Sequence, residues 1–154
     1  MKLAFLTSLL LVIISSSQVF SNTDTNNYDV LHYNIELEIL DFSSHNIKGH
    51  TSVDLIPKKN IKTLHLMLKS LQVDQIDLIG NVVTYQQFGD FIELRFQTEL
   101  TQNDTIQLVI DYHGVPAKDP SWGGFYFSST DGGYAYNMGV GFADKPHNYG
   151  RIWF

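Results

Sequence analysis

The residues of this chain that could bind a metal or transfer a proton are six histidines and a scattered set of carboxylates. A zinc site needs three or four ligands that converge at about 2 Å, held by helical or hairpin spacing. His32, His50 and His65 instead fall on the polar faces of different predicted strands, and His147 follows Pro146 in a loop. The other two are His45 and His113. The pattern favours surface histidines, so we assign no metal ligand in this chain.

The motifs of known hydrolases are missing from the sequence. It contains no His-Glu-x-x-His, no Gly-x-Ser-x-Gly, no phosphate-binding loop and no cysteine nucleophile. Glu36 with Glu38, and Asp74 with Asp77, are spaced to share a proton or Ca²⁺, but their open strand faces favour solvated pairs. Asn103-Asp104-Thr105 matches an N-glycosylation acceptor in a turn. The sequence therefore predicts no catalytic residue in this chain.

Alternating side chains predict that β-strands position these residues. Apolar residues from Tyr33 to Ile39 share one face of an extended chain, and polar neighbours occupy the other. A turn at 43–46 and a second strand that ends at Pro57 complete an antiparallel pair. The inward set of the second strand is predicted to be Ile47, Gly49, Thr51, Val53 and Leu55.

The same alternation continues along the chain. Further strands are predicted at Ile61–Leu68, Leu71–Ile79, Val82–Phe88, Ile92–Phe96 and Ile106–Tyr112. Gly80-Asn81 and Gly89-Asp90 are expected to be tight turns, and a change of parity at Asp74-Gln75 predicts a bulge. Glu93 and Arg95 are expected to face solvent. Because no window shows helical spacing, we expect an all-β fold, an antiparallel sandwich or open saddle of short strands.

The first residues are typical of a secretory signal peptide. A positive start, a short apolar core at Leu3–Ile14 and a small-x-small pattern ending at Ser21 predict a signal at residues 1–21. The apolar core is shorter than the roughly 20 residues that a membrane-spanning helix needs, so no transmembrane segment is predicted. Residues 22–27 are expected to be a disordered leader and residues 28–154 a domain. We therefore expect a secreted or periplasmic protein.

Composition narrows the possible partners. The formal charge is −6 and the acidic residues are scattered, which argues against nucleic acid as a partner and indicates a solvated surface. The chain has no cysteine although an exported protein would meet oxidising conditions. Its stability must therefore come from the packed core.

Residues 122–154 differ from the rest, because they contain half of the aromatic residues and most of the glycines. Phe125–Phe127 and Tyr134–Tyr136 are predicted to be two short strands joined by a turn at 128–131. Aromatic residues with polar groups favour interfaces and ligand grooves, so the segment is either a binding surface for a sugar or peptide or a junction with a following domain. An irregular end of the β-core is a further reading. The chain ends at Arg151–Phe154 without a polar tail, and we expect it to be the front part of a longer protein.

The order of several segments resembles the amino-terminal domain of the M1 zinc metallopeptidases, the aminopeptidase N family. These segments are Thr63-Leu64-His65-Leu66, Leu108–Gly114, Gly124–Ser128 and Arg151–Phe154. The resemblance covers Tyr28 to Phe154. In the family, Arg-x-x-Phe runs directly into Pro-Cys-x-Asp, so the resemblance implies a domain that is incomplete at its C-terminus.

The resemblance implies a non-catalytic β-saddle that packs on its own catalytic domain. Zinc and peptide hydrolysis would belong to that second domain and to the full-length enzyme, and this chain alone would be inert. The family's first domain supplies one Glu or Gln, upstream of Arg-x-x-Phe, that helps to hold the free amine of a peptide substrate. Met138–Phe142 here has neither, and Asp144 is the nearest anion.

These considerations give a set of candidate residues for a substrate cleft or domain interface. They are Gly141, Phe142, Asp144, Arg151, Trp153 and Phe154. The alternative function is a self-sufficient secreted β-sandwich that binds carbohydrate through the aromatic residues between Trp122 and Trp153, or an adhesive module.

Overall fold

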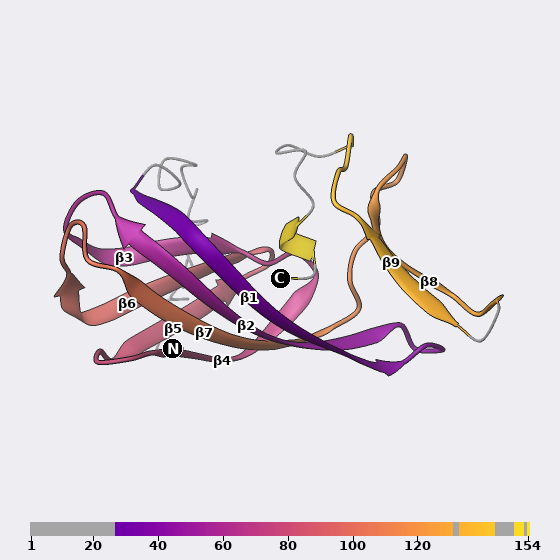
Figure 1. Cartoon of the computed structure of the whole chain (residues 1–154), viewed down its shortest axis with the longest axis horizontal. Coiled ribbons are helices and arrows are strands. Elements are labelled where there is room, and N and C mark those ends of the chain that lie inside the picture. The colour runs from indigo at the N-terminus through magenta and orange to yellow at the C-terminus, as the bar shows by residue number, and fades with distance from the viewer. Residues whose placement is uncertain (1–26, 131–132, 144–149, 153) are drawn as a thin grey trace, which may run out of the picture.

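The computed structural model describes residues 27–130, 133–143, 150–152 and 154. The described part is all-β and antiparallel, as predicted, with one short 3₁₀ helix near its end (Figure 1). The elements are β1 (Tyr28–Asp41), β2 (Asn46–Pro57), β3 (Ile61–Met67), β4 (Leu71–Leu78), β5 (Val83–Phe88), β6 (Phe91–Leu100), β7 (Ile106–Gly114), β8 (Gly124–Ser128), β9 (Tyr134–Met138) and η3 (Gly150–Ile152). The predicted signal peptide and nearly all of the predicted leader lie outside the described residues.

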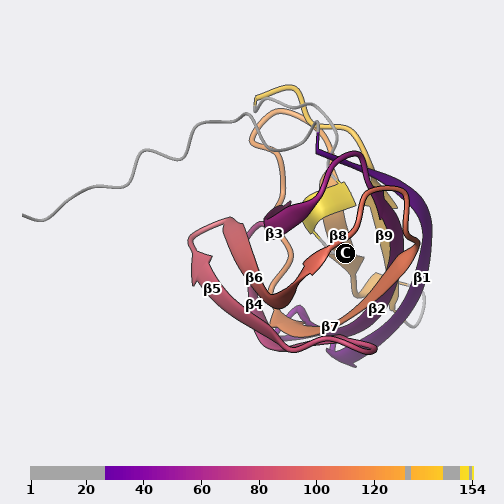
Figure 2. The ribbon, with the colours of Figure 1, turned by 90° about the vertical axis from the view of Figure 1, so that its left-hand side faces the viewer.

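Two sheets pack face to face. One has the order β1-β2-β7-β4 and the other the order β3-β6-β5. The predicted inward set of β2 is buried throughout, together with Leu108 and Tyr112 on the neighbouring strand β7 and Leu94 on β6 of the facing sheet. Figure 2 shows the two sheets in cross-section, with η3 between β1 and β3. The core is thus the apolar face of each alternating strand.

Local signals in the sequence placed the turns and the bulge correctly. Gly80 and Gly89 have φ of 80° and 58°, the left-handed region that glycine adopts without steric cost. The pairing of β4 with β7 shifts register between Val73 and Gln75, where the parity of the apolar residues changes. The predicted bulge is therefore confirmed.

The two long sides of the sandwich are closed differently. On one side, Gln87 on β5 accepts a hydrogen bond from Val73 N at 3.0 Å and donates one to Leu71 O at 2.6 Å, so its side chain pairs with the edge of β4. Tyr85 adds a bond to Asp74 O at 3.0 Å. On the other side the edges of β1 and β3 face each other across a cavity.

His65 and Glu93 differ from the expectation that both face solvent. They are opposite each other on β3 and β6, and their side chains are 24% and 12% exposed. Glu93 Oε1 accepts a bond from Arg95 Nε at 2.6 Å, and Glu93 Oε2 lies 3.2 Å from His65 Nε2. Glu93 thus has one partner across the sheet and one along its own strand, and these contacts allow His65 and Glu93 to be largely shielded from solvent.

Candidate functional site

A buried carboxylate organises the loop before β8. Asp119 is 5% exposed, and its Oδ1 accepts hydrogen bonds from the backbone N–H groups of Ser121 and Trp122, both at 2.9 Å. Its Oδ2 accepts a third from Ala143 N at 2.9 Å. One side chain therefore ties the loop at 119–122 to the segment that follows β9.

Two glycines let these segments approach closely. A Cβ on Gly123 would lie 1.6 Å from Val140 O, and one on Gly124 would lie 2.6 Å from Lys118 Cα. Both residues have positive φ, 100° and 107°. Only glycine satisfies the space and the backbone conformation together. The loop at 139–143 is consequently held against the start of β8.

This arrangement positions two of the predicted site residues. Gly141 is buried, whereas Phe142 is 59% exposed and stacks on Trp122, with ring centroids 5.6 Å apart. We call these two rings the Trp122–Phe142 pair. Asp144 lies outside the described residues.

The β8–β9 hairpin forms a separate two-stranded sheet beyond one end of the sandwich (Figure 1). Its inner face packs on the domain, because Phe125 is buried and Phe127 contacts Phe42 and His45 at the β1–β2 turn. The side chains of the intervening residues point to the opposite, outer face, as expected for strands. Only one side of this hairpin is therefore covered by the described domain.

The outer face of the hairpin carries three tyrosines that we call the tyrosine column. Tyr126 stacks on Tyr136 at 5.1 Å, and Tyr136 on Tyr134 at 5.9 Å. Lys118 Nζ lies 5.1 Å from the centroid of the Tyr126 ring. Tyr134 and Tyr136 remain 50% and 44% exposed.

The segment around these rings is poor in charge. Between Pro120 and Ala143 the sequence holds a single charged residue, whereas charged residues make up 17% of the whole chain. Exposed aromatics with few charges are the composition of the centre of a protein interface.

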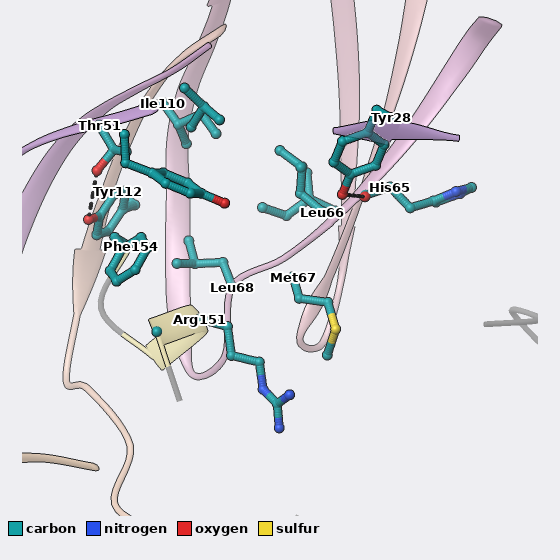
Figure 3. A pocket seen from close by; sticks show the side chains of 14 residues that line it. Tyr28, Thr51, His65, Leu66, Met67, Leu68, Ile110, Tyr112, Arg151 and Phe154 are labelled. Carbon is teal, nitrogen blue, oxygen red and sulfur yellow. Dashed lines mark hydrogen bonds between the residues drawn. The ribbon is translucent and has the colours of Figure 1, made fainter. Parts of the chain in front are cut away.

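A second feature is a cavity of about 310 Å³ between β1 and β3 (Figure 3). Its lining is mainly apolar, and Tyr28 closes one end by donating a hydrogen bond to His65 O at 3.0 Å. Thr51 and Tyr112 form another side, with their hydroxyls 3.1 Å apart. Burial raises the pKa of Tyr112, partly offset by Thr51, and burial also raises that of Tyr33.

The cavity brings together two other predicted site residues, Arg151 and Phe154. Phe154 packs edge-on against Tyr33 at 5.1 Å, and Arg151 O accepts a bond from Lys69 N at 2.7 Å. Figure 3 shows the Arg151 guanidinium pointing away from Tyr28 and Ile110. Trp153 lies outside the described residues. The predicted set is thus divided between the cavity and the loop after β9, rather than joined in one cleft.

Sequence reasoning missed Asp119 and Tyr33. A signal for Asp119 was present, because Asp-Pro-Ser is typical of a turn in which the carboxylate binds the following backbone N–H groups. Nothing local marked Tyr33 as a cavity residue, because that role depends on Phe154 reaching it from the far end of the chain.

Among the described residues, no group of three or more histidine, cysteine, aspartate or glutamate side chains can hold a metal ion. Two of the histidines each pair with a single carboxylate instead: His50 with Asp111 at 2.7 Å, and His113 with Asp74 at 2.8 Å. Desolvation of Glu93 raises its pKa, but the bonds from Arg95 and His65 outweigh this and leave the pKa below its usual value. The described residues therefore do not fit a zinc site.

Comparisons with known proteins identify the fold. No family model matches the sequence, and a search of curated proteins finds no significant relative. Solved structures do match. An M1 zinc metallopeptidase mutant from Deinococcus radiodurans, bound to a Tyr-Ser-Ala substrate, has a TM-score of 0.58 and 19% identity over 69% of this chain. The M1 zinc metallopeptidase structure from the same organism has a TM-score of 0.58 and 18% identity over 75% of this chain.

A two-domain M1 zinc metallopeptidase mutant bound to L-arginine matches with a TM-score of 0.56 and 20% identity over 69% of this chain. In each case the match covers 27% of the solved chain. This chain therefore has the fold of a part of these enzymes and spans about a quarter of their length. No helix in the described part of the chain has the length and apolar character to cross a membrane.

Proposed function

We propose that this chain is the N-terminal, non-catalytic domain of a secreted or periplasmic M1-like zinc metallopeptidase. The full-length enzyme would hydrolyse peptides, with zinc and the catalytic groups in the part that follows. The shared fold and its 27% coverage of the solved enzymes support a domain of a larger protein. The signal-like residues 1–21 support export.

The observation that carries the proposal is the uncovered aromatic surface of the β8–β9 hairpin. An isolated two-stranded sheet is marginally stable in water, so packing on its second face would add support. The tyrosine column and the Trp122–Phe142 pair offer aromatic, uncharged area for this purpose. The partner that fits is the enzyme's own catalytic domain.

The ring geometry argues against the carbohydrate-binding alternative. A sugar ring packs on an open aromatic face, but Tyr126 and Tyr136 each cover one face of the other ring, with an interplanar angle of 12°. Lys118 lies over the Tyr126 ring, and Trp122 and Phe142 stack with an interplanar angle of 25°, so that each covers one face of the other. Each stacked ring therefore has at most one free face for a sugar, whereas the exposed surface of the rings together can pack on a protein partner.

The loop at 138–142 is proposed to approach the substrate of the full-length enzyme. An ammonium group that leaves water needs an anionic or strong acceptor partner, and loss of one partner of a buried charge pair costs about 3–5 kcal/mol. Met138–Phe142 supplies no side-chain carboxylate or amide. We therefore expect the enzyme to depend less on a free amine than M1 aminopeptidases with Glu or Gln at this place.

Comparing free with N-acetylated peptides on the full-length enzyme tests this expectation, with Asp144→Asn beside the wild type. Similar rates on both peptides are expected. A loss of several orders of magnitude on acetylation, unchanged by Asp144→Asn, would show that the catalytic domain holds the amine unaided.

The proposed function itself is tested by the coding sequence after residue 154 and by the metal content of the product. We expect Pro-Cys-x-Asp and then His-Glu-x-x-His, one zinc per full-length protein, and neither zinc nor aminoacyl hydrolysis in residues 22–154 alone. A stop codon at position 155, or one tightly held zinc in the isolated chain, would refute it.

A further inference from the structure

β1 ends the four-stranded sheet and pairs along one side only. Its ladder with β2 runs without interruption from His32 to Ile39, between register shifts at Val30/His32 and Ile39/Asp41. Among the described residues, no backbone group outside β2 is hydrogen-bonded to this stretch. Alternate residues of an edge strand direct N–H and C=O outward, so His32–Ile39 is a template for another strand.

This edge is less protected against pairing than the edge of β4. Edge strands are normally protected by charged side chains, lysine above all, by proline, by a central bulge or by a covering segment. The charged side chains in the regular stretch of β1 are Glu36 and Glu38. β4 has both a central bulge and the Gln87 side chain. β1 has no lysine, arginine or proline in its sequence, YDVLHYNIELEILD, and Leu31 and Leu40 are 56% and 53% exposed beside the regular stretch. Figure 2 shows β1 on the outside of its sheet.

We propose that β1 pairs with β1 of a second copy of this chain, antiparallel about a twofold axis at Ile35, so that the two four-stranded sheets join. Residues opposite each other in an antiparallel pair point to the same face. In this register Asn34 lies opposite Glu36 of the second copy, and His32 lies opposite Glu38. On the inner face Tyr33 meets Leu37, and Ile35 meets its own copy.

Other registers fit less well. An axis at Glu36 places that residue against itself, and an axis at Leu37 places Glu36 against Glu38. Like charges directly opposite each other destabilise a strand pair. An axis at Asn34 shortens the regular paired stretch to 32–36, because the register shift at Val30/His32 interrupts it. The axis at Ile35 uses 32–38 and places no two carboxylates directly opposite each other.

Variants of opposite charge at Asn34 test the pairing. Asn34 is exposed and lies opposite Ser52 within the chain, so both charges are tolerated in the monomer. Asn34→Lys would face Glu36 of the second copy twice and tighten the dimer, and Asn34→Glu would weaken it, each by about tenfold. Sedimentation equilibrium measures the dissociation constant, and circular dichroism checks the fold.

A rescue and a control complete the experiment. The double variant Asn34→Glu, Glu36→Asn again places Glu opposite Asn, and it should return the dissociation constant to near the wild-type value. Gln97→Lys and Gln97→Glu change the same charge at an exposed residue of β6 and should have little effect. A monomer at the highest soluble concentration would overturn the proposal. So would a dimer insensitive to the charge at Asn34, or one that responds equally at Gln97.

Discussion

At the scale of single residues, a few side chains determine where whole segments lie. Asp119 joins the loop before β8 to the residues after β9 through three backbone hydrogen bonds. Gly49 leaves the space that the ring of Tyr112 occupies. Glu93 is held between His65 and Arg95. For each of these residues, a substitution is expected to lower the stability of the fold by a measurable amount.

Asp119→Ala should lower the free energy of unfolding by about 2–4 kcal/mol, because the partly buried N–H groups of Ser121, Trp122 and Ala143 lose their acceptor. Urea denaturation measures the loss, and hydrogen exchange at Ala143 should accelerate. Asp104→Ala, at an exposed turn, is the matched control. Equal stability of the two variants would mean that water replaces the carboxylate without cost.

Gly49→Ala should destabilise the domain by about 1–3 kcal/mol, because the added Cβ would lie 2.0 Å from Cζ of the buried Tyr112 ring. Gly139→Ala is the control, since its Cβ would meet nothing closer than 3.7 Å. Thermal unfolding compares the two. A harmless Gly49→Ala would show that the Tyr112 ring moves freely, against the packing described above.

Glu93 gives a prediction about pH. Because its pKa is lower in the folded chain than the ordinary value of a glutamate, Glu93 stabilises the fold above that ordinary pKa, and the contribution is lost as pH falls through the folded pKa. Glu93→Gln should therefore reduce the free energy of unfolding more at pH 7 than at pH 3. Urea denaturation at both pH values tests this, with Glu99→Gln on the exposed end of β6 as control. An equal loss at both pH values would point to packing rather than charge.

At the scale of elements, the two long sides of the sandwich and the hairpin have different degrees of cover. The β4–β5 side is joined by Gln87, the β1–β3 side encloses a cavity, and the hairpin exposes one face. Residues 122–154 combine exposed surface with part of the core. Phe125 and Ile152 belong to the core, because strand alternation and η3 turn them inward.

We expect β9 to be the least protected strand of the isolated chain, because its two-stranded sheet is covered on one face only. Hydrogen exchange followed by mass spectrometry compares β9 with β7, a central strand. Equal protection of the two would mean that the hairpin is part of the domain's own core and that its outer face is not an interface.

At the scale of the whole molecule, the sequence predicted what depends on neighbouring residues. Strand alternation located the two-layer core, and parity located the bulge near Asp74, since both are read within a few residues. The sequence did not predict that Arg151 and Phe154 line the cavity beside Tyr33, or that Gly141 and Phe142 lie apart from them in the loop after β9. Those placements depend on contacts between distant parts of the chain, for which local periodicity carries no signal.

In the proposed full-length enzyme, the part that follows this chain covers the outer face of the β8–β9 hairpin. Hydroxyl-radical footprinting of Tyr134 and Tyr136, in residues 22–154 and in the full-length protein, tests it most directly. We predict that both tyrosines react several-fold more slowly in the full-length protein, while the exposed Phe88 on β5 reacts at the same rate in each. Equal rates for Tyr134 and Tyr136 in the two proteins would contradict the account.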